Sequence, residues 1–210
     1  MKLVLLGAPG AGKGTQAEIL SHMCEIPTIS TGNILRAAIK AGTPVGLKAK
    51  DLIENGKLVP DDVIITIIGE RLAEDDCRNG YILDGVPRTI PQAEALENLG
   101  IILDAAVSLE ISDEQIIERM SGRRTCPDCG HSHHIVTNPP ATEGTCDACS
   151  GVLETRKDDE PEVVRQRLDT YHRDTEPLKE FYAKRGKLKA VESQPTIPAT
   201  TEKIRKALGI

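Results

Sequence analysis

Aromatic side chains are scarce in this sequence of 210 residues, which has no Trp, one Phe and three Tyr. Any stacking on a ligand must therefore come from Arg and aliphatic groups. Long apolar runs are missing as well, and none approaches the roughly 20 residues that a membrane span needs. A basic excess is also missing, because 26 Lys and Arg face 32 Asp and Glu, for a net charge of −6. We expect no membrane or nucleic-acid partner, and any anion site must be a local cluster of Arg and Lys.

Targeting signals and low-complexity segments are not visible either. The opening residues "MKLVLLG" have no small-residue cleavage site after them, so they predict a buried strand and no signal peptide. With 39% hydrophobic and 28% charged residues, the composition is typical of one globular core, with room for insertions. We expect a cytoplasmic location. In a reducing compartment the six Cys residues are expected to be thiols or metal ligands.

Short apolar runs alternate with helical patterns along the chain. Strands are predicted at 2–6, 81–84, 105–111 and 188–191, separated by segments long enough for crossover helices. This alternation predicts an α/β fold with a parallel sheet covered on both faces. Helix starts are predicted at Pro44 after Thr43, at Asp61 after Pro60, near Pro91 after Thr89, and after Ser112, where Gln115 completes a capping box.

Two stretches interrupt this alternation. Residues 30–59 read as two short helices joined by "AGTP", and residues 122–159 have turn residues, clustered His and Cys, and no helical period. We interpret both as insertions that protrude from the core.

The strongest chemical signal is "GAPGAGKGT" at 7–15, which matches the phosphate-binding P-loop except that Gly14 stands where Ser or Thr is usual and Thr15 follows. Glycines let backbone N–H groups close around phosphate oxygens, and the helix that begins near Lys13 directs its positive end at them. Lys13 would reach the outer phosphates, and the Thr15 hydroxyl is placed near a magnesium ion. An apolar strand before the loop and a helical pattern after it are the context that the motif requires.

Asp84 ends the predicted strand "YILD", and ligands bind at the carboxyl ends of the strands in open α/β sheets. This makes Asp84 a candidate to hold magnesium-bound water. Asp104 has a similar setting but precedes its strand, so it is expected at the opposite end of the sheet.

Four cysteines follow a metal-knuckle pattern, Cys126-x2-Cys129-x16-Cys146-x2-Cys149. Four thiolates fill a tetrahedral site and leave no open position, which predicts a structural zinc. A segment of under forty residues buries little apolar surface, so a metal can supply folding energy that packing lacks. Iron or cobalt, or His131 in place of one Cys, stay open as alternatives.

The whole chain resembles the adenylate kinase family. The resemblance rests on "GAPGAGKGTQ" (7–16), "STGNILR" (30–36), "GKLVPD" (56–61), "DGVPRT" (84–89), "GRRTCPDCG" (122–130) and "RKDDEPEVVRQRL" (156–168). It implies a P-loop NTPase core at 1–29, 60–121 and 160–210, a nucleoside monophosphate-binding insertion at 30–59 and a lid at 122–159. It also implies a monomer that converts Mg-ATP and AMP into two ADP.

Bringing two polyphosphates together requires positive charge, and guanidinium groups suit phosphate oxygens best. The candidates, all matching arginines of the family's motifs, are Arg36, Arg88, Arg119, Arg123, Arg156 and Arg167. With Lys13 and Asp84, we expect Arg88, Arg123, Arg156 and Arg167 to act in catalysis. No general base is expected, because an acceptor phosphate with a second pKa of about 6 is already largely ionised at neutral pH.

The resemblance also implies nucleotide contacts. Those to AMP are Thr31, Arg36, Lys57, Leu58, Val59, Gly85, Val86, Pro87, Arg88, Gln92, Arg156 and Arg167. Those to ATP are Gly10, Ala11, Gly12, Lys13, Gly14, Thr15, Arg119, Arg123, Ser132, His133 and Pro195. Val86 stands where the family commonly has Phe, so looser packing beside the acceptor base is expected. His133 stands where related lids often have an aromatic residue.

Two alternatives remain. A kinase acting on UMP or CMP would share the phosphate chemistry, although Thr31, Gln92 and the long metal-bearing lid favour AMP. A non-enzymatic nucleotide-binding zinc-ribbon protein would use Cys126 to Cys149 to bind a partner, but the negative net charge and the missing N-K-x-D motif argue against it.

Overall fold

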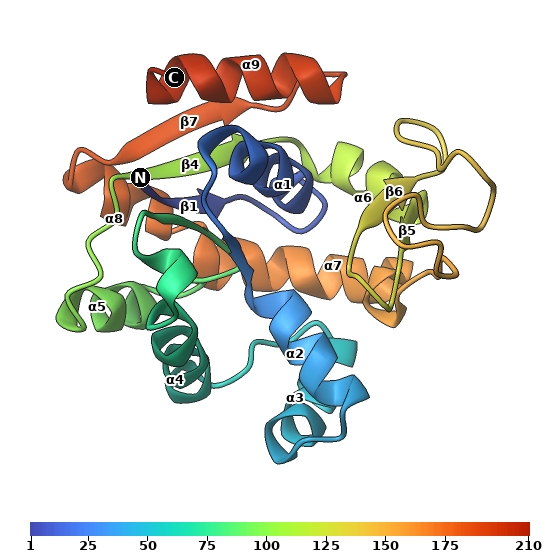
Figure 1. Ribbon diagram of the computed structural model, residues 1–210, viewed down its shortest axis with the longest axis horizontal. Coiled ribbons are helices and arrows are strands. Elements are labelled where there is room, and N and C mark those ends of the chain that lie inside the picture. The colour runs from blue at the N-terminus through green and yellow to red at the C-terminus, as the bar shows by residue number, and fades with distance from the viewer.

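A computed structural model describes all 210 residues. Five parallel strands form one sheet in the order β2-β3-β1-β4-β7 (Figure 1). Their bounds are Lys2–Leu6 for β1, Thr28–Ser30 for β2, Tyr81–Asp84 for β3, Ala105–Glu110 for β4 and Leu188–Glu192 for β7. The predicted parallel α/β sheet is confirmed. The prediction omitted β2 and ran β4 one residue too far.

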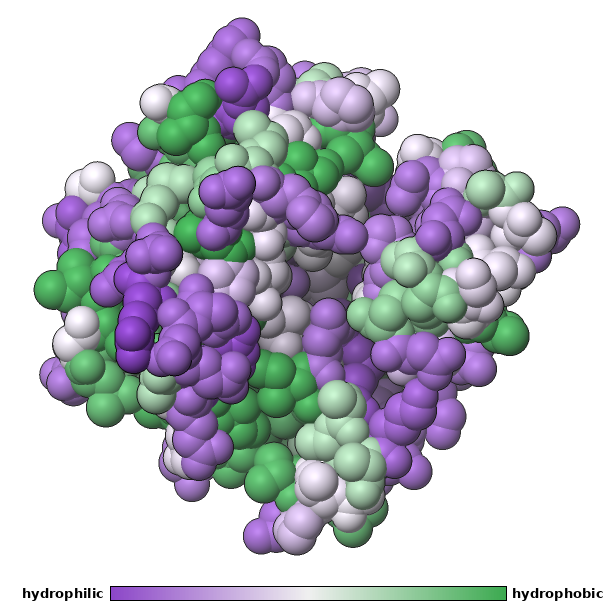
Figure 2. Space-filling view, in the orientation of Figure 1, coloured by the Kyte–Doolittle hydropathy of each residue, from purple (hydrophilic) through white to green (hydrophobic).

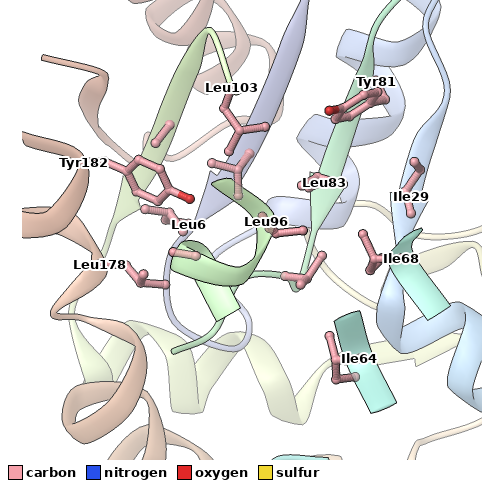
Figure 3. Packing of buried hydrophobic residues seen from close by; sticks show 14 of the residues in the cluster. Leu6, Ile29, Ile64, Ile68, Tyr81, Leu83, Leu96, Leu103, Leu178 and Tyr182 are labelled. Carbon is pink, nitrogen blue, oxygen red and sulfur yellow. The ribbon is translucent and has the colours of Figure 1, made fainter. Parts of the chain in front are cut away.

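Helices cover both faces of the sheet. On one face lie α1 (Lys13–Cys24) and α9 (Ile197–Leu208), and their apolar residues join a cluster of 12 buried residues that includes Leu20, Ile82 and Ile204. On the other face lie α4 (Asp61–Leu72), α5 (Ile90–Asn98) and α8 (Leu178–Lys184). Ile68, Leu96 and Leu178 of these helices pack on β1 and β3 within a cluster of 19 buried residues (Figure 3). Both faces are thus sealed by apolar packing, which fixes the strand ends in place.

The predicted helix starts are confirmed, and all but that of α4, which follows Pro60, have a capping bond. The Thr43 hydroxyl accepts from Gly46 N at the start of α3 (Pro44–Glu54), and the Thr89 hydroxyl accepts from Gln92 N at the start of α5. Ser112 and Gln115 form the expected capping box of α6 (Asp113–Ser121). Such caps satisfy N–H groups that a helix leaves without partners in its first turn.

Two segments project from the sheet and its helices (Figure 1). Residues 30–59 contain α2 (Thr31–Lys40) and α3, which pack on each other. Residues 122–159 contain the antiparallel pair β5 (Arg123–Thr125) and β6 (Ser132–His134), followed by long irregular loops and a short 3₁₀ turn, Lys157–Asp159. A second 3₁₀ turn, Asp75–Cys77, follows α4.

The chain returns from residue 159 to the sheet through α7 (Pro161–Thr170), which continues as a π-helical turn, Tyr171–Thr175. Glu176 N–H donates to the Tyr171 carbonyl (2.8 Å), the five-residue step that defines such a turn. None of the helices is long and apolar enough to span a membrane.

Candidate active site and metal centre

A cleft opens where β1 and β3 end. It is lined from several parts of the chain, namely the P-loop, α2, residues 56–59, residues 85–92 and the segment from Asp158 to Thr175. Figure 2 shows a hollow in this face of the molecule beside residues 122–159, which lie at the right of the view. The location agrees with the rule that ligands bind at the carboxyl ends of parallel strands.

The P-loop joins β1 to α1 through glycines with positive φ. Gly7, Gly10 and Gly12 have φ values of 137°, 81° and 96°. A Cβ on Gly10 would lie 2.8 Å from Met120 Sδ, and one on Gly7 would lie 2.8 Å from the Leu109 carbonyl, so neither position accommodates a side chain. The loop therefore presents backbone and the N-terminus of α1 to the cleft, which favours an anion.

Lys13, the first residue of α1, lies across this loop. Its Nζ donates to the carbonyls of Gly7 (2.6 Å) and Ala8 (2.8 Å). Burial lowers the pKa of Lys13 to about 8; the Asp84 charge acts in the opposite direction, and nearby arginines lower the pKa further. An ammonium group that is short of solvent and counterions is suited to bind phosphate.

Asp84 lies beside the P-loop at the end of β3. A Cβ on Gly14 would be 3.6 Å from Asp84 Oδ2, which places this carboxylate next to the first turn of α1 and near Thr15. Carboxylate and hydroxyl oxygens are ligands that Mg²⁺ accepts, directly or through water. Asp104 lies at the other end of the sheet, as predicted, where its Oδ2 accepts from Lys2 N (2.7 Å).

Arg88 is held at three points. Its Nε donates to the Gly85 carbonyl (2.9 Å), its backbone N–H donates to Gln92 Oε1 (2.7 Å), and its carbonyl accepts from the Thr175 hydroxyl (2.8 Å). Burial lowers the pKa of Arg88. The two terminal nitrogens of the guanidinium are free of protein hydrogen bonds, so they can contact a ligand in the cleft.

Three more arginines gather around a buried acidic pair, Asp158 and Asp159. Arg123 pairs with Asp159, with Nε 2.7 Å from Oδ2, and Arg167 Nη1 lies 2.7 Å from Asp158 Oδ2. Burial alone would raise the pKa of Asp158, but the charges of Arg167 and Arg123 hold it below its usual value. Burial also lowers the pKa of Arg167 to about 10. The sequence reasoning missed both aspartates, although they lie in "RKDDEPE" beside Arg156.

Arg156 differs from its neighbours, because its side chain has no ion pair or hydrogen bond and its Nε is buried. Burial, followed by the charges of Arg123 and Arg36, lowers the pKa of Arg156 to about 9. The region therefore holds more positive charge than its two aspartates balance.

Most residues predicted to contact the acceptor line this cleft. They are Thr31, Arg36, Lys57, Leu58, Val59, Gly85, Pro87, Arg88, Gln92 and Arg167. Gln92 is buried, where its Oε1 accepts from Arg88 N and its Nε2 donates to Asp61 Oδ1 (2.7 Å). These bonds leave one donor and one acceptor of the amide for a ligand. The Thr31 hydroxyl donates to the Gly85 carbonyl (3.0 Å).

Val86 and Arg156 are the predicted acceptor residues outside this lining. The Val86 side chain is fully buried in the 19-residue core cluster. The neighbouring Gly85 and Pro87 line the cleft instead. Its substitution for Phe therefore changes core packing, and any acceptor contact at this position comes from the backbone.

Of the predicted donor residues, Lys13 is the one that lines the cleft. Arg119 Nη2 is 3.5 Å from the Gln194 carbonyl, next to the exposed Pro195. Ser132 is partly buried in β6, with its hydroxyl 3.4 Å from that of Thr125. His133 lies in the strand β6 of the 122–159 segment and is 3% exposed.

The four predicted cysteine ligands come together. Their Sγ atoms all lie within 4.8 Å of one another, with Cys126 and Cys149 3.4 Å apart and Cys129 and Cys146 3.6 Å apart. A zinc ion with Zn–S bonds of about 2.3 Å requires sulfurs about 3.8 Å apart, which these spacings approach. His131 is outside the cluster, since its Nδ1 lies 3.1 Å from Glu18 Oε1.

The two knuckles have the same backbone design. Gly130 N donates to the Cys126 carbonyl (2.9 Å), and Ser150 N donates to the Cys146 carbonyl (2.8 Å). A backbone hydrogen bond from Cys129 lowers the pKa of Cys126 to about 7, whereas burial raises the pKa of Cys129. A Cβ on Gly151 would lie 2.9 Å from Cys126 Sγ, so only glycine fits against the sulfurs. The donor set and this close backbone fit a four-coordinate thiophilic metal.

Comparisons with known proteins agree with this geometry. The sequence model of the family described as adenylate kinase matches residues 5–187. Relatives named adenylate kinase include one from Caldicellulosiruptor bescii, 52% identical over 214 residues and all of both chains. Another, from Acetivibrio thermocellus, is 52% identical over all of this chain and 98% of its own, and one from Clostridium perfringens is 50% identical over 100% and 99%. The chain belongs to the adenylate kinase family.

Proposed function

We propose that the protein transfers the terminal phosphoryl group of Mg-ATP reversibly to AMP, giving two ADP. As a member of its family it is a phosphotransferase that acts on nucleotides. The observation that carries the proposal is the convergence of Lys13, Arg88 and Arg167 on one cleft with the predicted acceptor residues. Charges from separate elements meet there, as the joining of two anionic nucleotides requires.

The P-loop residues Gly10 to Thr15 bind the phosphates of ATP through backbone N–H groups, and Lys13 contacts the outer phosphates. Asp84 and Thr15 hold Mg²⁺, which arrives with ATP and offsets charge on its phosphate oxygens. Binding of phosphate moves Lys13 Nζ away from the Gly7 and Ala8 carbonyls toward the anion. Arg119 and Pro195 border the donor adenine, and Ser132 and His133 contact ATP through their backbone.

Arg88, Arg123, Arg156 and Arg167 stabilise the charge that spreads over the transferring phosphoryl group. Asp158 and Asp159 keep Arg123 and Arg167 oriented while their remaining N–H groups face the phosphates. Fixed donors of this kind stabilise a transition state without reorganisation. Arg36, Thr31 and Gln92 hold AMP, together with the backbone at 57–59 and 85–88.

Proton transfer by a side chain is not required, since the acceptor phosphate is already an anion near neutral pH. The cleft accordingly needs positioning and charge, and its lining contains no His. This separates the reaction from phosphorylation of an alcohol, where a base removes the hydroxyl proton.

We divide the chain into a core (1–29, 60–121 and 160–210), an acceptor-binding insertion (30–59) and a lid (122–159). Contacts between the lid and the insertion support a closing motion. Lys40 of α2 pairs with Asp128 of the first knuckle (2.7 Å), and Glu54 of α3 pairs with Lys157 (3.3 Å). Closure delivers Arg123 and Arg156 to the cleft and expels water.

Zinc held by Cys126, Cys129, Cys146 and Cys149 has a structural role in this lid. Four thiolates leave no position for substrate. We further propose a cytoplasmic monomer whose partners are ATP, AMP and ADP, with no nucleic-acid or membrane partner.

The test is the rate of ADP formation from Mg-ATP with AMP, UMP, CMP or GMP as acceptor. We expect a large preference for AMP. A preference for a pyrimidine nucleotide would contradict the roles of Thr31 and Gln92 but leave the phosphate chemistry standing. Transfer to none of the four, with tight nucleic-acid binding, would favour a binding protein instead.

A further inference from the structure

Thr175 lies in the π-helical turn, far in sequence from the P-loop and from Arg88. Its hydroxyl donates to the Arg88 carbonyl over 2.8 Å, a contact that joins positions 87 residues apart. No other hydrogen bond to that carbonyl is present. Thr175 also lines the cleft, together with Thr170 and Tyr171.

The position of Thr175 depends on the π-helical turn. Pro177 has no N–H, and in a continuous α-helix its ring would clash with the carbonyl of Arg173. The chain instead makes the wider turn closed by Glu176 N and the Tyr171 carbonyl, and α8 begins at Leu178. The additional residue in the turn brings Thr175 to the cleft beside Arg88.

Side chains around the turn fix it to the sheet and to α6. Glu176 Oε2 is 2.8 Å from His172 Nδ1, and Glu176 Oε1 is 3.0 Å from Lys179 Nζ. Lys179 in turn donates to Glu110 at the end of β4 (2.6 Å), and His172 Nε2 lies 3.0 Å from Asp113. The Thr175 hydroxyl is therefore a donor on a braced support.

Arg88 needs such a support because it follows Pro87 in a loop, outside any helix or strand. Gln92 holds its N–H and Gly85 holds its Nε, but without Thr175 its carbonyl is free to rotate with the peptide plane that leads to Thr89. A small change in that plane moves the guanidinium at the far end of a long side chain. Misplacement of a catalytic group by about 1 Å costs up to about 100-fold in rate.

We propose that Thr175 is a positioning residue for phosphoryl transfer, which holds Arg88 in its reactive orientation through the Arg88 carbonyl. This inference rests on the role of Arg88 in the proposed function. It assigns the π-helical turn a purpose in the reaction, because the turn is what places the hydroxyl there.

The experiment compares Thr175→Val, which keeps the shape but removes the donor, with Thr175→Ser, which keeps the donor. We expect Thr175→Val to lower kcat by about 10- to 100-fold with KM for ATP and AMP changed less than about threefold, as loss of orientation predicts. Thr175→Ser should keep at least about a third of the wild-type kcat. Thr175→Ala is a second donor-free variant if Val disturbs folding.

Thr66→Val is the matched control, since it removes a hydroxyl bond of the same length (2.8 Å, to the Asp62 carbonyl) on the exposed side of α4. Its kcat should equal that of the wild type. A merely structural effect would lower Tm alike in the Ser and Val variants and leave their kcat values equal. Equal losses of kcat in Thr175→Ser and Thr175→Val would thus overturn the inference.

A double-mutant cycle with Arg88→Ala isolates the path of the effect. If Thr175 acts through Arg88, Thr175→Val should cost less than about twofold in the Arg88→Ala background, where there is no guanidinium to position. The same loss of kcat from Thr175→Val in both backgrounds would contradict the positioning role. So would a wild-type kcat in Thr175→Val while Arg88→Ala is inactive. Either result would leave the proposed function of the cleft standing. A wild-type kcat in Arg88→Ala would contradict the proposed function of the cleft itself.

Discussion

The cleft and the lid of this protein obtain their order by different means. The cleft stands on the ends of a sheet whose two faces are packed into clusters of 19 and 12 buried residues. The lid has a hydrophobic cluster of three residues, Cys126, Cys146 and Leu153, and two of these are proposed metal ligands. Apolar packing therefore fixes the site of the reaction, while the proposed zinc replaces a core in the segment that we propose to move.

The two regions also differ in the kind of side chain that they hold in an unfavourable environment. The cleft region buries positive charge, since burial lowers the pKa of Lys13, Arg88, Arg156 and Arg167. The lid leaves apolar side chains in water, with Val136 75% exposed and Val152 68% exposed. Buried groups with shifted pKa values of this kind are common at functional sites.

The greatest contrast between the regions is expected in turnover. Arg88→Ala or Lys13→Met should lower kcat by about 1,000-fold or more, because each removes a charge aimed at the phosphoryl group. Neither should lower Tm, since a buried charge is removed. Arg78→Ala is the control, because Arg78 is 77% exposed and pairs only with Asp75. A normal kcat in either cleft variant would contradict the role given to that residue.

Substitution of a cysteine in the lid should lower the stability of the protein. Cys126→Ser should remove one metal ligand and about 3 kcal/mol or more of stability, or about 6–12 °C in Tm for a chain of this length. In the cold, kcat should stay within about threefold of the wild type, where the lid remains folded. Cys24→Ser, at the lone partly buried thiol that ends α1, should change Tm little. The prediction is wrong if both variants behave alike in thermal unfolding.

Removing a charge from the arginine cluster should stabilise the protein. Arg156→Met should raise the free energy of unfolding by about 1–3 kcal/mol, because the half-buried Arg156 has no ion pair and its buried Nε has no hydrogen-bond partner. Urea unfolding measures this, and kcat/KM for AMP should fall in the same variant. A less stable Arg156→Met would show that the charge is better compensated than its contacts indicate.

The low pKa of Lys13 predicts a pH effect. Above its pKa of about 8, the free enzyme loses the ammonium charge, so kcat/KM for Mg-ATP should fall by about tenfold per pH unit. Bound phosphates raise the pKa of Lys13, so kcat itself should decline only at higher pH. Lys13→Arg keeps a charge over this range, and whatever activity it retains should not show the decline. A kcat/KM that stays flat to pH 10 in the wild type would contradict the shift.

The smallest expected effect on stability comes from the residue that follows the second cysteine of each knuckle. Gly130 and Ser150 occupy equivalent positions with φ of 79° and 62°, a region that costs a residue with a side chain about 1–2 kcal/mol. Ser150→Gly should therefore stabilise the lid by up to about 1 kcal/mol, and Gly130→Ser should destabilise it. Hydrogen exchange of the lid amides measures both, and slower exchange in Gly130→Ser would reverse the interpretation.

Local patterns were sufficient to predict most of the fold. Caps at Thr43, Thr89 and Ser112 mark helix starts because a capping bond spans three residues. The strand β2 was missed because it is three residues long and has one apolar side chain, Ile29, so it depends on pairing with β3. Short strands of this kind are specified by distant partners, which one-dimensional periodicity does not record.

The site divides in the same way. Spacing alone identified the P-loop and the four cysteines, because those ligands come from short motifs. It did not identify Asp158 and Asp159 as partners of the arginines, the burial of Val86 and His133, or the bond from Thr175 to Arg88. These features depend on contacts across long stretches of chain, so they required the structure.

One measurement most directly separates the role of the cleft in turnover from the role of the lid metal in stability. Zinc-loaded protein is treated with a strong chelator, and ADP formation in the cold and the thermal unfolding curve are recorded on the same sample before and after. We predict that the lid unfolds at a lower temperature while cold turnover is largely kept. Loss of turnover and of stability in equal proportion would show that the metal takes part in the reaction, and would contradict a structural centre.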